Sequence, residues 1–460
     1  MSVFIYLLGK FLALCPEFIL RGICLFVVFL MKIFMPKRMR IIYSNIKKCY
    51  PTWSDKKLRA FASESSARTI EMGIFVLASP YMSEKELKKR FVLSDSLKKH
   101  LEFYAKNPRP IVLLVPHFAM MEAITMLPML NDLETPRTGV FYRPMDSKAI
   151  DDWVLKTRSR FGVNLISRKA GLTKAFDFLK ANGAIGVLFD QSPNVTGILS
   201  YFFSRPCYSS NLAGLFVEKY KSDLGFMYAK RTGFFRAEIN AEIIECKKDN
   251  LSVMIAGNEK LEHFLKTDES LSADWLWLHN RWKLSQKPLA LLNLKHSKTV
   301  LEETRPETDY KRQNIYINLA TQESDIKQII PLIKEIEIAR EDANLSLFVE
   351  REQLDFVKSL NLGYKLIVIP RLSDGIFKYR QAIKALQNEY ISLLIQFRSD
   401  SKSDSFIKKI KPLQSIAFSA TKTKRKPYSN SVYIDPKLPA RESYRQFLEQ
   451  FGLPKVSMGA

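Results

Sequence analysis

The two residues best suited to chemistry are His117 and Glu122, which follow an apolar run. Residues 111–115 are Ile, Val and Leu and predict a buried strand that Pro116 ends, and a helix-like run over 119–127 follows. Helical positions five apart diverge by about 140°, so the side chains meet only if His117 lies in the turn before the helix. A carboxylate on one imidazole nitrogen would leave the other free to accept a proton from a hydroxyl.

The alternative is a strand-end histidine with an unrelated surface glutamate, and the pair alone does not exclude it. Five further blocks support the chemical interpretation. They are Tyr142-Arg143-Pro144; Arg158-x-Arg160-Phe161-Gly162; Gly186-Val187-Leu188-Phe189-Asp190-Gln191 with Gly197; Tyr201-Phe202-Phe203; and Trp277-Leu278-His279-Asn280-Arg281-Trp282-Lys283.

These blocks, in this order over roughly residues 1 to 290, resemble the lipid A biosynthesis lauroyl/myristoyl acyltransferase family. That family is a branch of the lysophospholipid acyltransferase-like group. One departure concerns the segment between Phe118 and Glu122. Many relatives have Gly-Asn-Trp there, whereas this chain has Ala119-Met120-Met121, so local backbone or acceptor contacts would differ.

The resemblance implies acyl transfer from a thioester to a hydroxyl, with His117 as the general base and Glu122 as its orienting partner. The donor would be an acyl carrier protein thioester, with coenzyme A left open, and neither a metal nor a cofactor is implied. The chain has no G-x-S-x-G elbow, which argues against a covalent acyl-enzyme. Direct attack by the acceptor hydroxyl is therefore expected.

The same resemblance implies a set of substrate-binding residues. Arg143, with Arg158 and Arg168 as further candidates, would meet a phosphate of the acceptor or of the carrier through forked hydrogen bonds. Asp190 and Gln191 would line the acceptor pocket. The alternatives are surface charges for the arginines and a helix or turn cap for Asp190.

Apolar runs alternate with amphipathic segments between residues 111 and 283, which predicts a layered α/β domain with a largely parallel sheet. His117 and Asp190 both fall just past predicted strands, as a site at one sheet edge requires. The expected strands are 111–115, 138–142, 185–189 and 225–230, and the expected helices are 55–76, 84–104, 119–127, 147–160, 171–181 and 211–220.

Residues 3–36 are dense in large apolar side chains but are interrupted by charges, and a basic cluster follows over 32–40. This pattern predicts a membrane-anchoring helix over 1–40, either a tilted span or a helix in the interface. A buried helix of the soluble domain is the alternative. The five cysteines form no CxxC motif, which favours a reducing compartment. The expected location is the cytoplasmic side of the cell inner membrane.

The chain carries 71 Lys and Arg against 47 Asp and Glu, a net charge of +24. Such a balance attracts polyanions. Because no zinc-finger spacing or RNA-binding aromatic signature occurs, no nucleic-acid partner is expected. The expected partners are acyl carrier protein, a glycolipid acceptor and anionic lipids of the inner membrane.

Beyond the acyltransferase-like domain of residues 41–290, residues 291–312 lack periodicity and predict a linker. Residues 313–460 show a second βαβ series, with strands expected at 315–319, 345–349, 366–369 and 391–396. This Rossmann-like half-domain is faintly similar to the N-terminal half of heptosyltransferase-like glycosyltransferases. Too little chain remains for a nucleotide-sugar half, so a non-catalytic role is expected.

The leading hypothesis is a membrane-bound O-acyltransferase that acts on a glycolipid such as a lipid A precursor. Two alternatives stay open. The first is the same chemistry on a phospholipid or phosphatidylinositol mannoside, and the second is an inactive acyltransferase fold that binds lipid.

Overall fold

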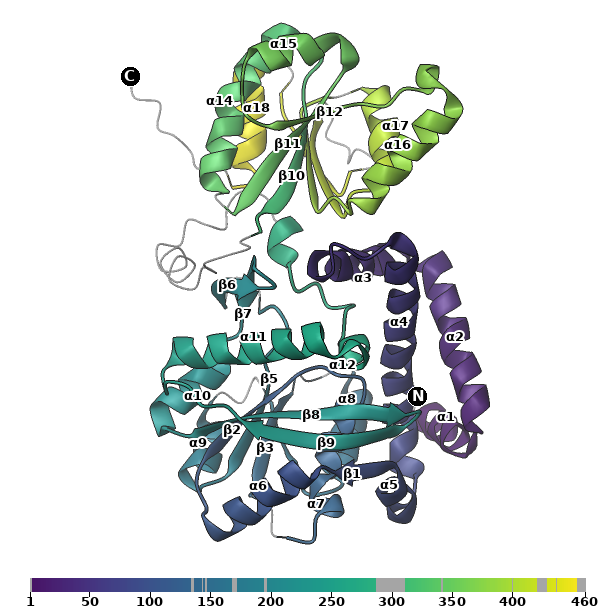
Figure 1. The fold of residues 1–460 in the computed structure, drawn as a ribbon, viewed down its shortest axis with the longest axis vertical. Helices are drawn as coiled ribbons and strands as arrows, with labels where there is room; N and C mark the ends of the chain where they lie inside the picture. Colours follow the sequence, from purple (N-terminus) through teal and green to yellow (C-terminus); the bar gives the residue numbers. More distant parts are fainter. Residues whose placement is uncertain are drawn as a thin grey trace. The chain divides into compact units, whose positions relative to one another are not determined.

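The computed structural model describes residues 2–133, 136–142, 144, 147–167, 172–193, 197–286, 311–340, 342–398, 400–419, 428–435 and 437–452. The chain divides into two compact units (Figure 1). The first unit comprises Met1–Ile42, Lys56–Gly197 and Ser209–Arg281, and the second comprises Tyr43–Asp55, Ile198–Tyr208 and Trp282–Ala460. Each unit is a mixed α/β structure with a Rossmann-like, mainly parallel sheet.

The sheet of the first unit has seven strands in the order β1-β9-β8-β2-β5-β3-β4, and only the β8–β9 pair is antiparallel. Its strands are β1 (Phe91–Leu93), β2 (Ile111–Val115), β3 (Thr138–Tyr142), β4 (Asn164–Ser167), β5 (Ala184–Leu188), β8 (Asp223–Gly233) and β9 (Arg236–Ile243). All five residues of β2 are buried. The central strand is therefore covered on both faces, as its continuous apolar sequence predicts.

Helices cover both faces of this sheet (Figure 1). They are α4 (Asp55–Ala78), α5 (Glu84–Arg90), α6 (Asp95–Lys106), α7 (Leu127–Leu130), α8 (Lys148–Arg158), α9 (Thr173–Lys180), α10 (Leu212–Tyr220), α11 (Asn250–Thr267) and α12 (Glu269–Asp274). Helix α11 approaches the sheet at Gly257, where an added Cβ would lie 2.7 Å from Leu114 Cδ1. This close approach fixes α11 over the carboxyl half of β2.

Two apolar helices, α1 (Ser2–Leu14) and α2 (Glu17–Phe34), begin the chain, and α3 (Pro36–Cys49) follows. Glu17 ties the start of α2 to the sheet unit, since its carboxylate accepts from Arg90 at 3.0 Å and pairs with Arg236 at 2.7 Å. More than half of the exposed large hydrophobic side chains described belong to residues 4–35. These helices therefore bury one narrow stripe and leave a wide apolar surface uncovered.

Within the described residues, no helix taken alone combines the length and hydropathy needed to cross a bilayer. Helices α2 and α3 meet that test only as a pair, and they are bent by 103° at their junction.

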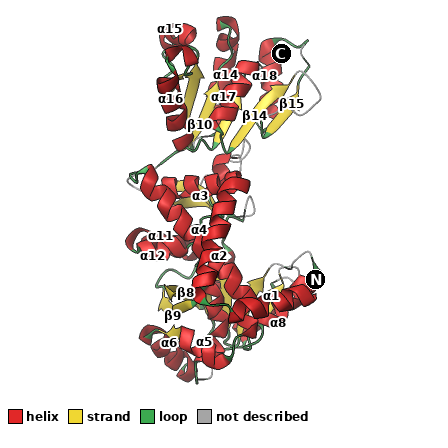
Figure 2. Cartoon of the chain, turned by 90° about the vertical axis from the view of Figure 1, so that its right-hand side faces the viewer, coloured by secondary structure: helices red, strands yellow, loops and turns green. Residues whose placement is uncertain are grey.

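The second unit holds a six-stranded parallel sheet in the order β12-β11-β10-β13-β14-β15 (Figure 2). Its strands are β10 (Gln313–Asn318), β11 (Ala343–Val349), β12 (Lys365–Val368), β13 (Leu393–Gln396), β14 (Gln414–Ser419) and β15 (Asn430–Tyr433). Its helices are α14 (Glu323–Ala339), α15 (Leu354–Ser359), α16 (Ile376–Asn388), α17 (Ser401–Ile410) and α18 (Ala440–Glu449). A separate hairpin joins β6 (Ile198–Phe202) to β7 (Arg205–Ser209).

Every expected strand of both sheets is present, with its ends shifted by at most three residues. The single helix expected over 1–40 is instead divided among α1, α2 and α3, and two further expected helices differ. The stretch 84–104 is broken, because Phe91–Leu93 pairs with β9 as a strand and Ser94 then caps α6 by accepting from Leu97 N at 3.1 Å. The run 119–127 forms a 3₁₀ helix over Met121–Met126. The expected linker lies outside the described residues except for Lys311 and Arg312.

Candidate active site

His117 and Asp190 lie side by side at the carboxyl edge of the first sheet. Strands β2 and β5 are parallel neighbours, and Val115 is matched with Leu188 in their register. Both strands end at this matched pair, and the chain then continues for two residues, to His117 and to Asp190. Because the strands run in the same direction, equal offsets from a matched pair place the two side chains at the same point of the edge. The convergence expected from the sequence is therefore present.

The Asp190 carboxylate holds His117 by two hydrogen bonds. Asp190 Oδ1 lies 2.6 Å from His117 Nδ1, and the backbone N–H of His117 donates to Oδ2 at 2.9 Å. The indole N–H of Trp275 also donates to Oδ2, at 2.8 Å. Burial would raise the pKa of Asp190, but the charge and hydrogen bonds of His117, together with Trp275, lower it to about 2. The carboxylate is therefore anionic at neutral pH.

This anion fixes the tautomer of the ring. With the proton of the neutral imidazole on Nδ1, facing Asp190, the lone pair of Nε2 is free to accept a hydrogen bond. The side-chain NH₂ group of Gln191 donates to this lone pair, with its Nε2 at 3.1 Å from His117 Nε2. The His117 side chain is 11% exposed. The group has the arrangement of an oriented general base.

Glu122 lies elsewhere, and its expected contact with His117 is not formed. The Glu122 carboxylate is paired with Arg158 in a two-pronged contact, Nε to Oε1 at 2.8 Å and Nη2 to Oε2 at 3.0 Å. The prediction that Glu122 orients the imidazole is therefore wrong for this structure. The physical reason is that Asp190 already takes Nδ1, while the 3₁₀ turn at Met121–Met126 directs Glu122 toward α8.

Of the expected phosphate-binding arginines, only Arg158 lies in the described residues. Its guanidinium is half-buried and is engaged by Glu122. Arg143 and Arg168 fall outside the part of the chain that the structure describes. Gln191 contacts the ring of His117, and the neighbouring Ser192 N donates to His279 Nε2 at 2.7 Å. The segment after β5 is thus held by two histidines.

Trp275 lies two positions before the Trp277–Lys283 block and was not predicted as a site residue from the sequence. The backbone around Trp275 pairs with the segment that follows β2. Leu276 N donates to His117 O at 3.0 Å, and Trp275 forms an antiparallel bridge with Phe118. The signal for its role would have been the indole N–H, because a buried donor of this kind needs an acceptor. That acceptor is Asp190, 85 residues away in the sequence.

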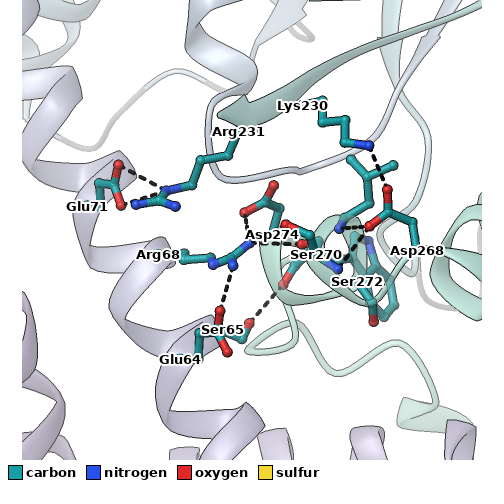
Figure 3. Close-up of polar contacts among 12 residues, drawn as sticks. Glu64, Ser65, Arg68, Glu71, Lys230, Arg231, Asp268, Ser270, Ser272 and Asp274 are labelled. Carbon is teal, nitrogen blue, oxygen red and sulfur yellow. Dashed lines mark hydrogen bonds and ion pairs between the residues drawn. The ribbon is translucent and has the colours of Figure 1, made fainter. Parts of the chain in front are cut away.

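Helix α4 holds α12 and the start of the Trp275 segment through a buried polar network (Figure 3). Arg68 on α4 donates to Asp274 Oδ1 at 2.7 Å, and Ser65 Oγ donates to the carbonyl of Trp275 at 3.3 Å. Asp274 is almost fully buried. Burial raises its pKa to about 6, against the opposing effect of Arg68. The residue before Trp275 is therefore anchored by a buried ion pair.

A second ion pair extends this network to β8. Glu71, one turn further along α4, accepts from Arg231 Nε at 3.0 Å and from the backbone N–H of Phe235 at 2.8 Å (Figure 3). Together these contacts join α4, β8 and α12. The donor that stabilises Asp190 is thus positioned by α4, the helix that follows the three N-terminal ones.

Weak similarity to glycosyltransferases is found among solved structures. E. coli heptosyltransferase WaaC with ADP is 16% identical, with a TM-score of 0.26 over 31% of this chain and 49% of that one. A glycosyl transferase of family 9 from Veillonella parvula is 16% identical, with a TM-score of 0.24 over 32% of this chain and 44% of that one. The chain thus spans less than half the length of these two structures. No curated protein matches.

The first unit has a clear family assignment. The family model described as bacterial lipid A biosynthesis acyltransferase matches residues 2–284, a span that contains His117, Asp190 and Trp275. Since the match covers more than half of the chain, the chain belongs to the bacterial lipid A biosynthesis acyltransferase family.

Proposed function

We propose that this protein transfers a fatty acyl group from an acyl carrier protein thioester to a hydroxyl of a glycolipid of the lipid A precursor class. The observation that carries the proposal is the Asp190–His117 pair, at 2.6 Å, which leaves the second ring nitrogen in contact with Gln191. Membership of the family supports acyl transfer as the reaction. The donor, the acceptor and the role of His117 are parts of the proposal.

In the proposed reaction, the acceptor hydroxyl replaces Gln191 as the hydrogen-bond donor to His117 Nε2. The hydroxyl oxygen attacks the thioester carbonyl while its proton passes to Nε2, so that an O–C bond forms and an O–H bond breaks. The C–S bond then breaks, and the departing thiolate takes the proton from the imidazolium. Asp190 stabilises that imidazolium throughout, because it is a buried anion in contact with Nδ1.

We further propose that the protein works at the cytoplasmic side of the inner membrane, seated by α1 and α2. Their exposed apolar side chains include Phe18 at 74% and Phe34 at 74% exposure, which is unusual for a free surface. The exposed cations Lys32, Lys37 and Arg38 follow directly. An apolar face beside a basic cluster suits an anionic leaflet. A lipid acceptor and an acidic carrier protein could then reach the same enzyme.

The test is acyl transfer by the purified full chain in detergent or nanodiscs, with labelled acyl carrier protein and a lipid A precursor. His117→Ala should lower turnover by about 10²–10⁴-fold, the usual contribution of a general base. His263→Ala, an exposed histidine on α11, is the matched control and should leave turnover unchanged. Equal activity of His117→Ala and wild type would remove His117 from the mechanism.

The alternative of an inactive lipid-binding fold has one observation in its favour. Glu122 is bound to Arg158 and does not contact His117, in a segment where Ala119-Met120-Met121 departs from many relatives. Wild-type inactivity on lipid A precursors, phosphatidylinositol mannosides and lysophospholipids, combined with retained lipid binding, would establish that alternative.

A further inference from the structure

A wide cavity lies in the second unit, at the carboxyl edge of its sheet. It has a volume of about 770 Å³, and its walls come from the loops after β10, β11, β12 and β13 and from helices α16 and α17. Every lining residue belongs to the second unit. The cavity is large enough for one or two sugar rings with a charged substituent.

The position of this cavity follows from the order of the strands. Helix α14, after β10, packs on one face of the sheet, whereas α17, after the neighbouring β13, packs on the other. Two adjacent parallel strands whose chains leave in opposite directions open a crevice at their carboxyl ends, which is where open α/β sheets bind ligands. The crevice lies at this switch point.

A preorganised cluster of charges forms one wall of the cavity. Glu350 accepts from Arg371 Nη2 at 2.6 Å and also pairs with Arg398, which in turn donates to Asp400 at 2.8 Å. Burial would raise the pKa of Glu350, but the hydrogen bonds of both arginines hold it below its usual value. Paired guanidinium and carboxylate groups offer donors and acceptors at fixed positions, which suits the hydroxyl groups of a sugar.

The other charged side chains of the cavity favour an anionic ligand. Lys402 and Lys409 also line the cavity, so that four cationic side chains stand against the carboxylates of Glu350, Glu352 and Asp400, the last of which pairs with Arg398. Helix α17 begins at the wall with Ser401 and directs its positive end there. The sequence has no glycine-rich phosphate loop, the usual mark of a nucleotide site. A phosphate on a saccharide fits these features better than a nucleotide does.

The rim of the cavity is apolar on one side. Leu372 lines the cavity with 59% of its surface exposed. Four and five residues further along the chain, at the start of α16, Ile376 and Phe377 are 60% and 79% exposed. A smaller cavity of about 380 Å³ shares Pro370 and Tyr379 with the large one and is otherwise lined by Arg351, Asp374, Lys378 and Ala382. A polar crevice with an apolar lip matches the boundary between a head group and its lipid chains.

From these features we infer that the crevice of the second unit binds a phosphorylated saccharide, as a free sugar phosphate or as the head group of a glycolipid. The site is separate from the acyl-transfer site and does not depend on that activity. Its readout is therefore binding, which is measured on the full chain and remains informative if acyl transfer is absent.

The first arm of the test is calorimetric titration of the full chain with glucose 1-phosphate, glucose, inorganic phosphate and ADP. Glucose 1-phosphate should bind more tightly than the other three. Lys409→Gln and Lys402→Gln should each weaken it by about 5–20-fold, the loss of one charge-assisted contact. Lys408→Gln is the matched control, because Lys408 is exposed on the same helix but does not line the cavity.

The second arm uses nanodiscs with and without a phosphorylated glycolipid. If the ligand is a lipid head group, Phe377→Ser should weaken capture of the glycolipid discs but not binding of the free sugar phosphate. Ile338→Ser, an exposed aliphatic side chain on α14, is the control and should change neither. Tighter binding of ADP or inorganic phosphate than of glucose 1-phosphate would overturn the proposal. So would ligand binding in both arms that is insensitive to Lys402→Gln and Lys409→Gln, or no binding in either arm.

Discussion

Asp190 Oδ1 lies 2.6 Å from His117 Nδ1, and the two residues meet because each lies two positions past the last matched pair in the β2–β5 register. The second carboxylate oxygen receives two N–H groups, from the His117 backbone and from Trp275. The donors around the carboxylate therefore determine that Oδ1 faces His117 Nδ1 and that Oδ2 accepts from the other two N–H groups. This arrangement makes the tautomer of His117 a property of the fold.

Replacing Asp190 with Asn should reverse that tautomer. The amide oxygen of Asn would turn to the two donors at the Oδ2 position, which would leave its NH₂ group facing His117 Nδ1. The ring proton would then move to Nε2 and abolish the base, so we expect a loss of about 10²–10⁴-fold in kcat with the fold retained. Nitrogen-15 NMR of labelled histidine reports the protonated nitrogen directly. Glu122→Gln is the control and should leave the tautomer unchanged. If Glu122→Gln changed the tautomer and Asp190→Asn did not, Glu122 would be the orienting partner of His117.

The sequence was sufficient to predict the elements that carry the site. Apolar runs located β2 and β5, and the placement of His117 and Asp190 just past them predicted their convergence. The choice of partner could not be predicted, because it depends on the side-by-side placement of β2 and β5 and on an arginine 36 residues from Glu122. Local spacing favoured Glu122, the candidate carboxylate nearest to His117 in the sequence, whereas the sheet places Asp190 beside His117.

The helix expected over 84–104 failed for a related reason. Residues 91–93 have neighbours of high helix propensity, but their pairing with β9 buries Phe91 and Leu93 and overrides that local preference. The crevice of the second unit was equally invisible, because its walls come from four strand ends that only the strand order brings together.

Glu122 and Arg158 should be coupled in stability. Their contact is bidentate, and the Glu122 side chain is only 8% exposed, so removal of either partner leaves a poorly solvated charge. A double-mutant cycle with Glu122→Gln and Arg158→Gln should give a coupling free energy of about 1–3 kcal/mol by urea unfolding. Arg160 is the control, because it donates to the carbonyls of Ser79 and Met82 and should show no coupling to Glu122. Additive effects of Glu122→Gln and Arg158→Gln would contradict the pairing.

Trp275→Phe tests whether the indole N–H supports catalysis. The change keeps most of the ring but leaves Asp190 Oδ2 with one donor fewer, which should raise the pKa of Asp190 above about 2 and weaken its hold on His117. We expect a loss of about 10-fold in kcat, comparable to one charge-assisted hydrogen bond. Trp277→Phe removes a bond of similar length, 2.7 Å, to the carbonyl of Ser272. It should lower stability without lowering kcat, and equal kcat losses in the two variants would argue for a packing effect alone.

Asp274 should make stability depend on pH in an unusual direction. Burial raises its pKa to about 6, above the ordinary value of 3.8. A carboxyl whose folded pKa is raised contributes stability that is present below pH 4 and is lost as the pH rises through 6. Thermal unfolding of wild type and Asp274→Asn is measured at one heating rate between pH 4 and pH 7.5. The stability of wild type should rise relative to that of the variant as the pH falls.

Glu64→Gln provides the matched comparison for Asp274, since Glu64 is the other carboxylate partner of Arg68 but its side chain is 54% exposed. Its difference from wild type should not follow that trend, because burial is what links Asp274 to pH. A difference between wild type and Asp274→Asn that stays constant over this range would refute the assigned pKa direction.

The uncovered face of α1 and α2 should act as the membrane seat. Phe18 is 74% exposed and Phe29 is 56% exposed, so burial of either ring in the interface would contribute about 1–2 kcal/mol. Phe18→Ser and Phe29→Ser should each lower partitioning into anionic vesicles by about 5–30-fold in a sedimentation assay. Added salt should weaken binding further, since the exposed cations Lys32 and Lys37 follow on the same segment.

Ile338→Ser is the control for that partitioning, because it removes an exposed aliphatic side chain, 72% exposed, from α14 in the second unit. It should leave vesicle binding unchanged. If Phe18→Ser instead dissociates an oligomer into monomers and leaves vesicle partitioning unchanged, the apolar face of α1 and α2 is an interface between copies of the chain. The distinction is decisive, because the same side chains cannot lie in lipid and against a second copy of the chain at once.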